Sequence, residues 1–144
     1  MTEPFTKPFT TRVTVRGYEL DTQGHLNQAV YLQYAEHARW ELLRTAGIPG
    51  DKLRASGVGP AQLECTLRFR RELRGGDEVD VSCAFLFSDR KVFRVEQQFR
   101  KADGTLAAEL TGITGLLDLA ERHLISDPAG YLRKLADDPS VLGL

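Results

Sequence analysis

The chain has one long stretch with the period of an α-helix, and this stretch lies near its N-terminal end. Between about Ala29 and Ala46, apolar residues recur every three to four positions, as they do along the buried face of an amphipathic helix. The stripe consists of Val30, Tyr34, Ala38 and Leu42, with Leu32, Ala35 and Leu43 beside it. Gly47 and Pro49 follow and predict the end of the helix. One long helix cannot bury its apolar face alone, so the rest of the chain must cover it.

The rest of the chain alternates apolar and polar residues with a period of two, which is typical of half-buried strands. One alternating run precedes the helix and four follow it, at 11–18, 63–69, 79–87, 93–99 and 106–119. Short turn sequences join the last four runs, namely Gly75-Gly76-Asp77, Ser88-Asp89-Arg90-Lys91 and Asp103-Gly104. Because short turns join antiparallel neighbours, we expect an α+β fold in which an antiparallel five-stranded sheet packs around one long central helix.

The sequence contains no internal repeats, low-complexity tracts or linker, so we expect a single domain over residues 1–144. Residues 1–10 contain two prolines and two phenylalanines and are predicted to be a flexible lead-in. Residues 47–60 are predicted to be an irregular connection with one helical turn near Lys52. Ser126-Asp127-Pro128 predicts the start of a short C-terminal helix over about 126–137, with Asp127 as its cap.

Composition and charge exclude several classes of function. The net charge is −1 and basic–aromatic patterning is absent, so a nucleic-acid partner is not expected. No run approaches the roughly 18 apolar residues of a membrane span, and the N-terminus lacks the features of a signal peptide. We therefore expect a cytoplasmic protein without a membrane partner.

The two cysteines fall on separate alternating runs. We expect Cys65 and Cys83 to be buried, reduced thiols that pack as small apolar side chains. The alternatives are a disulfide, or a nucleophilic cysteine that acts with His123. Nothing in the sequence has the spacing of metal ligands, so no metal is expected.

A polar loop runs directly into the start of the long helix. Asp21, His25 and Asn27 lie within seven residues of one another, and Gly24 between them predicts a turn. Helix N-termini carry unpaired N–H groups and a partial positive charge, so they stabilise developing negative charge. A carboxylate, an imidazole and an amide at such a terminus are suited to polarising a carbonyl group and directing water at it.

These residues resemble a known family. A strand ending in Tyr18, the acid Asp21, the sequence Gly24-His25-Leu26-Asn27, then Tyr31 and the segment 34–39 are similar to the loop and helix of acyl-thioesterases of the 4-hydroxybenzoyl-CoA thioesterase type. The resemblance covers about residues 12–125 and is strongest over 18–39. It implies the hot-dog fold, in which an antiparallel five-stranded sheet wraps around a central helix.

The resemblance also implies roles for individual residues. Asp21 would act as general base or nucleophile on an acyl thioester, and the N–H groups near Gln28 and Ala29 would hold its carbonyl oxygen. The loop around Gly24 and the helix residue Tyr31 would contact the substrate. Polyketide-releasing relatives are thought to work without the acid, and in that mechanism Asn27 and Arg39 would replace it. His25 is a candidate for direct contact with the substrate.

The family further implies a substrate, partners and an assembly. The substrate would be an acyl-CoA or an acyl- or polyketidyl-carrier protein, hydrolysed without metal or organic cofactor. Arg90 and Lys91 would receive the phosphates of the carrier at the surface of a subunit pair. The chain would form at least a homodimer and often a homotetramer, with the acyl group between the central helix and a neighbouring subunit. The alternatives are a hot-dog dehydratase or hydratase, and a non-catalytic module that binds acyl carriers.

Each candidate also has a purely structural interpretation. Asp21 forms an Asx-type turn with the backbone near Gln23 in this interpretation, and His25 only braces the loop. Asn27 caps the helix, and Arg39 forms a surface ion pair with Glu36. Arg90 and Lys91 are then solvated residues that discourage strand pairing. If Asp21 lies at the lip of an apolar pocket, partial desolvation is expected to raise its pKa.

Overall fold

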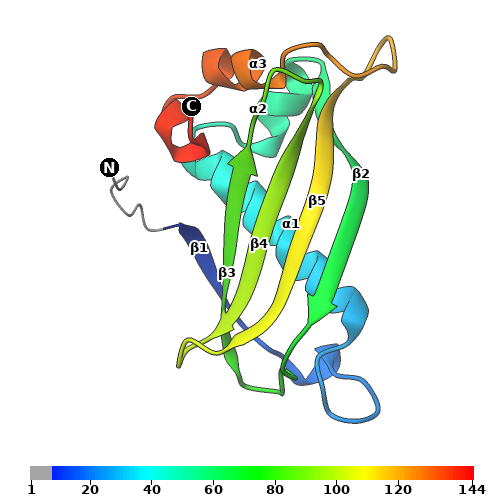
Figure 1. Ribbon diagram of the computed structural model, residues 1–144, viewed down its shortest axis with the longest axis vertical. Helices are drawn as coiled ribbons and strands as arrows, with labels where there is room; N and C mark the ends of the chain where they lie inside the picture. Colours follow the sequence, from blue (N-terminus) through cyan, green and yellow to red (C-terminus); the bar gives the residue numbers. More distant parts are fainter. Residues whose placement is uncertain (1–7) are drawn as a thin grey trace.

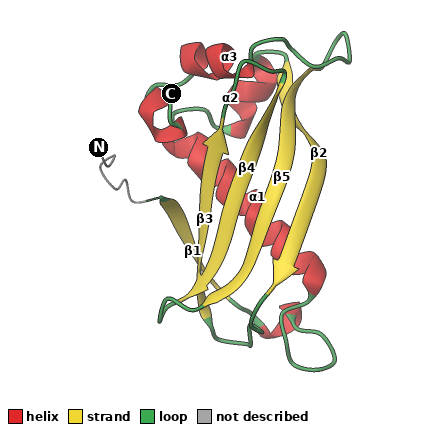
Figure 2. Cartoon of the chain, in the orientation of Figure 1, coloured by secondary structure: helices red, strands yellow, loops and turns green. Residues whose placement is uncertain are grey.

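The computed structural model describes residues 8–144, which form one antiparallel sheet wrapped around one long helix (Figures 1 and 2). In chain order the elements are β1 (Phe9–Thr14), α1 (Gln28–Thr45), α2 (Gly50–Ala55), β2 (Val58–Phe69), β3 (Glu78–Leu86), β4 (Val92–Lys101), β5 (Leu106–Asp118) and α3 (Pro128–Leu135). The five strands lie in the order β1-β3-β4-β5-β2. Helix α1 runs across one face of the sheet, and α2 and α3 gather at one end of it. The predicted α+β architecture is confirmed.

Helix α1 begins and ends where its sequence predicts. The Asn27 side chain accepts a hydrogen bond from the N–H of Ala29 at 2.9 Å and caps the first turn. After the helix, Gly47 has φ +88°, a conformation that glycine adopts without strain. Among residues 8–144, no helix is both long and apolar enough to cross a membrane.

The buried face of α1 matches the predicted stripe except in its first turns. Tyr34, Ala38 and Leu42 are buried as expected, but Leu32 is 46% exposed and Tyr31 only 3%. The prediction for Leu32 was therefore wrong. The helix turns Tyr31 toward the sheet, where its ring lies 5.5 Å from that of Phe99.

Strands β3, β4 and β5 form the centre of the sheet through short turns, as predicted. At the β4–β5 turn Gly104 has φ +90°, and the N–H of Lys101 donates to the carbonyl oxygen of Thr105 at 2.9 Å. The inward-facing residues of β4 are buried, and they include one polar side chain, Gln97, which is 1% exposed.

Strand β2 lies at the edge of the sheet and pairs only with β5 among the described strands. Two of its apolar side chains are uncovered, with Leu63 50% and Phe69 52% exposed, whereas Val58 at its start is buried. Cys65 is exposed as well, so the prediction that both thiols are buried was wrong for Cys65. Cys83, on the central strand β3, is a buried free thiol, and burial raises its pKa to about 12.

The terminal segments differ slightly from their predictions. Residues 1–7 of the predicted lead-in lie outside the described residues, while Phe9 and Thr10 belong to β1 and pair with β3. The expected single domain over 1–144 stays a prediction for that reason. The C-terminal helix begins as predicted, with the Asp127 carboxylate accepting from the N–H of Gly130 at 3.0 Å, and it ends at Leu135.

Candidate active site

The loop before α1 and the segment after β2 form the walls of a cleft of about 570 Å³. The cleft is lined by residues of the loop and the first helical turn, and by residues at the end of β2: Asp21, His25, Leu26, Asn27, Gln28, Tyr31, Phe69, Arg70, Arg71 and Glu72. Backbone contacts join the two walls, because the N–H of Leu26 donates to the carbonyl oxygen of Leu73 at 2.7 Å and His25 pairs with Arg74 in a β-bridge. The fold therefore brings the predicted loop together with residues distant in sequence.

Asp21 is held by the backbone of its own loop. Its Oδ1 accepts hydrogen bonds from the N–H groups of Gln23 at 2.9 Å and His25 at 3.0 Å. Gly24, with φ +80°, makes the turn that directs these N–H groups at the carboxylate. Hydrogen bonds to a carboxylate favour its charged form, so these bonds, that of His25 first, hold the pKa of Asp21 below its usual value. The prediction of a raised pKa was wrong, and the predicted Asx-type turn is confirmed.

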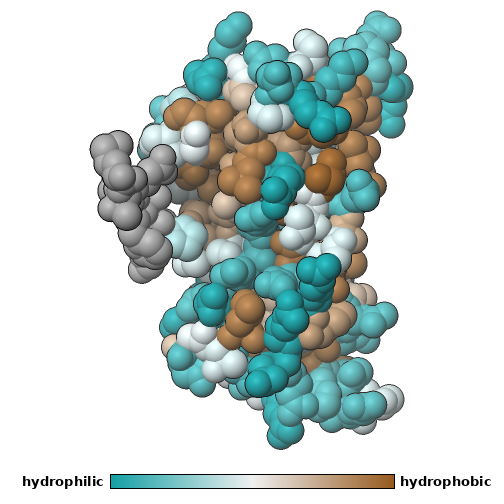
Figure 3. All heavy atoms as spheres, in the orientation of Figure 1, coloured by the Kyte–Doolittle hydropathy of each residue, from teal (hydrophilic) through white to brown (hydrophobic). Residues whose placement is uncertain are grey.

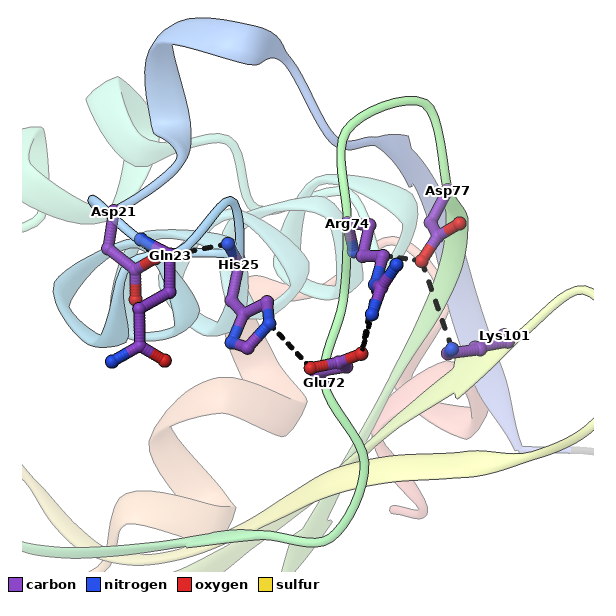
Figure 4. Close-up of polar contacts among 7 residues, drawn as sticks. All are labelled: Asp21, Gln23, His25, Glu72, Arg74, Asp77 and Lys101. Atoms are coloured by element: carbon purple, nitrogen blue, oxygen red, sulfur yellow. Dashed lines mark hydrogen bonds and ion pairs between the residues drawn. The ribbon is translucent and has the colours of Figure 1, made fainter.

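The ring of His25 pairs with an acid that the sequence analysis missed. Its Nε2 lies 2.5 Å from Oε2 of Glu72, as Figure 4 shows. The other oxygen of Glu72 accepts from the guanidinium of Arg74, which lowers the pKa of Glu72. Nothing in the local sequence indicates this contact, because it depends on the β-bridge between His25 and Arg74. The structural interpretation of His25 as a brace between loop and strand is thereby supported.

The N–H groups of Gln28 and Ala29, at the start of α1, were predicted to hold a carbonyl oxygen. One of them already has a hydrogen-bond acceptor and the other does not. The N–H of Ala29 donates to the Asn27 side chain, so the predicted capping role of Asn27 is confirmed. The N–H of Gln28 has no acceptor among residues 8–144. An unpaired N–H at a helix N-terminus, lining a cleft beside a carboxylate, can donate to an oxyanion. Of these two N–H groups, that of Gln28 is the one free to do so.

A partly buried acid, Glu19, joins the loop to α1. The Tyr34 hydroxyl donates to the Glu19 carboxylate at 2.5 Å, and the backbone carbonyl of Glu19 accepts from the N–H of Asn27 at 2.9 Å. Burial raises the pKa of Glu19, but the hydrogen bond from Tyr34 and the contacts with Arg16 outweigh it and keep the pKa low. Tyr31 closes the inner wall of the cleft, with its ring 5.0 Å from that of Phe69. The polar loop at the mouth of the cleft is therefore held in place by hydrogen bonds, and the aromatic rings of Tyr31 and Phe69 form its inner wall.

Three predicted site residues lie away from this cleft within one chain. Arg39 lines a different pocket, and the predicted ion pair with Glu36 is wrong, because Arg39 donates to Gln97 at 3.1 Å while Glu36 accepts from the indole of Trp40 at 3.5 Å. Arg90 and Lys91 lie in the β3–β4 turn, at the opposite end of the sheet (Figure 1). The basic residues that line the cleft itself are Arg70 and Arg71.

No group of three or more His, Cys, Asp and Glu side chains among residues 8–144 is arranged to hold a metal ion. The cleft brings together the Asp21 carboxylate, the His25–Glu72 pair, the N–H of Gln28 and the guanidinium groups of Arg70 and Arg71.

Comparisons with known proteins point to one family. Residues 15–142 match the model of the thioesterase-like superfamily. The chloroplastic acyl-acyl carrier protein thioesterase ATL3 of Arabidopsis thaliana is 38% identical over 91 residues, which cover 58% of this chain and 48% of the relative. The betainyl-CoA thioesterase of Pseudomonas aeruginosa is 36% identical over 106 residues, which cover 74% of this chain and 61% of the relative. The chain spans about half or less of the length of the first curated relatives it matches.

Solved structures share the fold over nearly the whole chain. A hypothetical protein of Aquifex aeolicus has a TM-score of 0.80 at 27% identity, covering 89% of this chain and 99% of that protein. A 1,4-dihydroxy-2-naphthoyl-CoA thioesterase of Synechocystis has a TM-score of 0.79, covering 90% of this chain and 96% of its own. Its identity is 17%, so this second likeness concerns the fold alone.

Proposed function

Because the chain belongs to the thioesterase-like superfamily and has the hot-dog fold, we propose that it hydrolyses an acyl thioester. Water adds its oxygen to the thioester carbonyl carbon, the carbon–sulfur bond breaks, and the thiol leaves with a proton to give a free acid. Asp21 would remove the proton from the water, or attack the carbonyl as a nucleophile to give a mixed anhydride. The N–H of Gln28 would donate to the oxyanion.

One observation carries this proposal: an exposed, ionised carboxylate and an unpaired helix-terminal N–H line the same cleft. A thioester already has a good leaving group, so its hydrolysis needs mainly oriented water and a donor for the oxyanion. Removing one such donor costs about 2.7–4 kcal/mol in studied enzymes, and a positioned base contributes about 10²–10⁴-fold. Asp21 and Gln28 would supply one of each.

The test is thiol release from a panel of acyl-CoA and acyl-pantetheine thioesters that includes short, long and aromatic acyl groups. We expect turnover of at least one of them without added metal or cofactor. No turnover with any thioester, together with tight binding of an acyl carrier, would instead support a non-catalytic carrier-binding module.

The carrier is proposed to be coenzyme A or an acyl carrier protein, and its phosphates to be bound by arginines. Relatives are named for acyl-acyl carrier protein, betainyl-CoA and long-chain acyl-CoA substrates, so the acyl group must be inferred from this chain's own pockets. Arg70 and Arg71 line the cleft, whereas Arg90 and Lys91 would have to come from a second copy. Guanidinium groups bind phosphates through paired N–H donors.

A homodimer through β2 is proposed as the active assembly. The outer edge of β2 is unpaired among the described strands, and its apolar side chains Leu63 and Phe69 are exposed. Antiparallel pairing of two β2 strands about a two-fold axis would continue the sheet and cover Leu63 and Phe69. It would also bring the Phe69 end of one strand beside the Pro60 end of the other. The cleft of one copy would then meet the pocket of its partner that Arg39 lines.

A hydratase or dehydratase is the second candidate, and the His25–Glu72 pair favours it. Such an enzyme needs a general base and a general acid across the acyl chain. Hydration of crotonyl-CoA without release of thiol would support this candidate over hydrolysis.

Replacement of Glu72 by glutamine tests whether His25 must be held in place. The variant keeps an oxygen that can accept from His25 but loses the charge, and exposed ion pairs are worth at most about 1 kcal/mol. We therefore expect kcat/KM to fall about fivefold or less. The control is Glu96→Gln, since Glu96 is a similarly exposed acid that accepts from an arginine, Arg94, on a strand away from the cleft. A loss as large as that of a catalytic residue would assign the pair a chemical role instead.

The low pKa of Asp21 predicts the pH dependence. A carboxyl whose pKa lies below its usual value, 3.8, stays ionised as the pH falls through 7 and 5, so it remains a competent base over that range. We expect no loss of kcat/KM from protonation of Asp21 above about pH 5. The measurement is kcat/KM from pH 4.5 to 8 for the natural chain and Asp21→Glu. An acid limb above pH 5 whose midpoint moves in Asp21→Glu would contradict the prediction.

A further inference from the structure

A second pocket, of about 240 Å³, lies between α1 and the inner face of the sheet. It shares no lining residue with the cleft around Asp21. Most of its wall is apolar, with side chains that include Trp40, Leu43, Phe93 and Leu116. Two charged residues line it, both from α1: Arg39, the only basic one, and Glu36, whose carboxylate accepts a hydrogen bond from the Trp40 indole. An apolar pocket with one cation is suited to a ligand that is apolar along most of its length and anionic at one point.

A buried glutamine fixes the direction of Arg39. The Nε2 of Gln97, which must be the donor atom, hydrogen-bonds the carbonyl oxygen of Ala35 in α1 at 2.9 Å. Its Oε1 therefore faces Arg39 and accepts from the guanidinium at 3.1 Å. Because Gln97 is only 1% exposed, both groups are tied to the core rather than to the surface. Arg39 is preorganised by this contact.

Arg39 has no acidic partner within residues 8–144. It is half-buried, and Gln97 accepts from one of its five N–H groups, while no Asp or Glu forms an ion pair with it. Glu36 stands one turn earlier on the same helix but contacts Trp40 instead. A guanidinium removed from water without a counter-charge destabilises a fold, and its remaining N–H groups match the two oxygens of a carboxylate.

From this geometry we propose that the pocket receives the acyl group of the substrate and that Arg39 binds a second carboxylate on that group. The substrate class is then the half-thioester of a dicarboxylic acid. This inference rests on the proposed hydrolysis, and it adds the identity of the acyl group. In the proposed β2-paired dimer, Phe69 of one copy would lie near Pro60 and Gln62 of the other, two residues that line this pocket. The acyl group would thus pass from the cleft of one copy to Arg39 of its partner.

The first test compares two thioesters of equal chain length, octanoyl-CoA and the CoA half-thioester of octanedioic acid. A hydrogen bond to a charged group contributes about 1.5–3 kcal/mol, so we expect kcat/KM to be about tenfold or more higher for the dicarboxylic substrate. In Arg39→Met, which keeps the apolar stem and removes the charge, that preference should vanish. Arg39→Lys, which keeps the charge and refills the space near Gln97, should retain part of it.

The second test measures binding alone, through Trp40, the only tryptophan of the chain and part of the pocket wall. Octanoate and 1-octanol have the same chain, and only octanoate is anionic. We expect octanoate to change the Trp40 fluorescence at about tenfold lower concentration than 1-octanol, and Arg39→Met to remove the difference.

The two tests separate this inference from the proposed function. Thioester hydrolysis without any preference for the anionic probe or substrate would overturn the inference and leave the hydrolase standing. Preference for octanoate without hydrolysis of any thioester would overturn the hydrolase and leave a carboxylate-binding pocket. Equal binding of octanoate and 1-octanol by the natural chain would be enough to reject the role of Arg39.

Discussion

Replacing Asp21 by asparagine is expected to lower kcat/KM for thioester hydrolysis by about 100-fold or more. Asparagine keeps an oxygen at the position of Oδ1, so it still accepts from the N–H groups of Gln23 and His25 and preserves the turn. It cannot take a proton from water or act as a nucleophile. The loss should therefore appear in kcat, while the free energy of unfolding changes little. Thiol release at saturating substrate and thermal unfolding measure the two effects separately.

Asp103→Asn is a matched control for this change. The Asp103 carboxylate also accepts from a backbone N–H two residues later, that of Thr105 at 2.9 Å, and its pKa is also lowered, first by contact with Thr105. It lies in the β4–β5 turn outside the cleft, so Asp103→Asn should leave hydrolysis unchanged. Full turnover in Asp21→Asn would contradict a role as base or nucleophile. The reaction would then depend on the Gln28 N–H and the amide of Asn27.

The parts of the fold that depend on short-range patterns could be predicted from the sequence. The period of α1, its cap at Asn27 and the Asp127-Pro128 helix start are each determined by neighbouring residues, and the structure contains all of them. Burial of β2 could not be predicted in the same way. Its alternation is that of a covered strand, yet Leu63 and Cys65 are exposed because β2 is an edge strand, and position in the sheet depends on long-range pairing.

In the candidate site, too, the residues that are close in sequence could be predicted and those brought in by long-range contacts could not. The loop residues Asp21, His25 and Asn27 were predicted because they are close in sequence, whereas Glu72 joins them only through a contact between distant segments. The pKa of Asp21 was predicted in the wrong direction, since its environment is set by two backbone N–H groups and not by the apolar floor of the cleft. Gln97 did carry a sequence signal, as a polar residue at an apolar position between Val95 and Phe99.

Replacing Leu63 on strand β2 by lysine is expected to separate the proposed dimer into single chains. Leu63 is 50% exposed in one chain, so a lysine there should cost the isolated chain little stability. In a two-fold assembly the same substitution occurs on both copies, and charged residues on an edge strand oppose further pairing. We expect the natural chain to have the mass of at least a dimer by light scattering, and Leu63→Lys to have the mass of a single chain.

Loss of the dimer should also remove activity, because the cleft of one copy would no longer meet the pocket of its partner. Truncating a central interface residue costs at least about 2 kcal/mol at a hot spot, so at micromolar enzyme we expect hydrolysis to fall about tenfold or more. Leu86→Lys is the control, since Leu86 is 43% exposed on β3, away from the β2 edge; it should change neither mass nor rate. Full activity in a Leu63→Lys single chain would mean that one copy holds the complete site, and the acyl group would then have to reach Arg39 within its own chain.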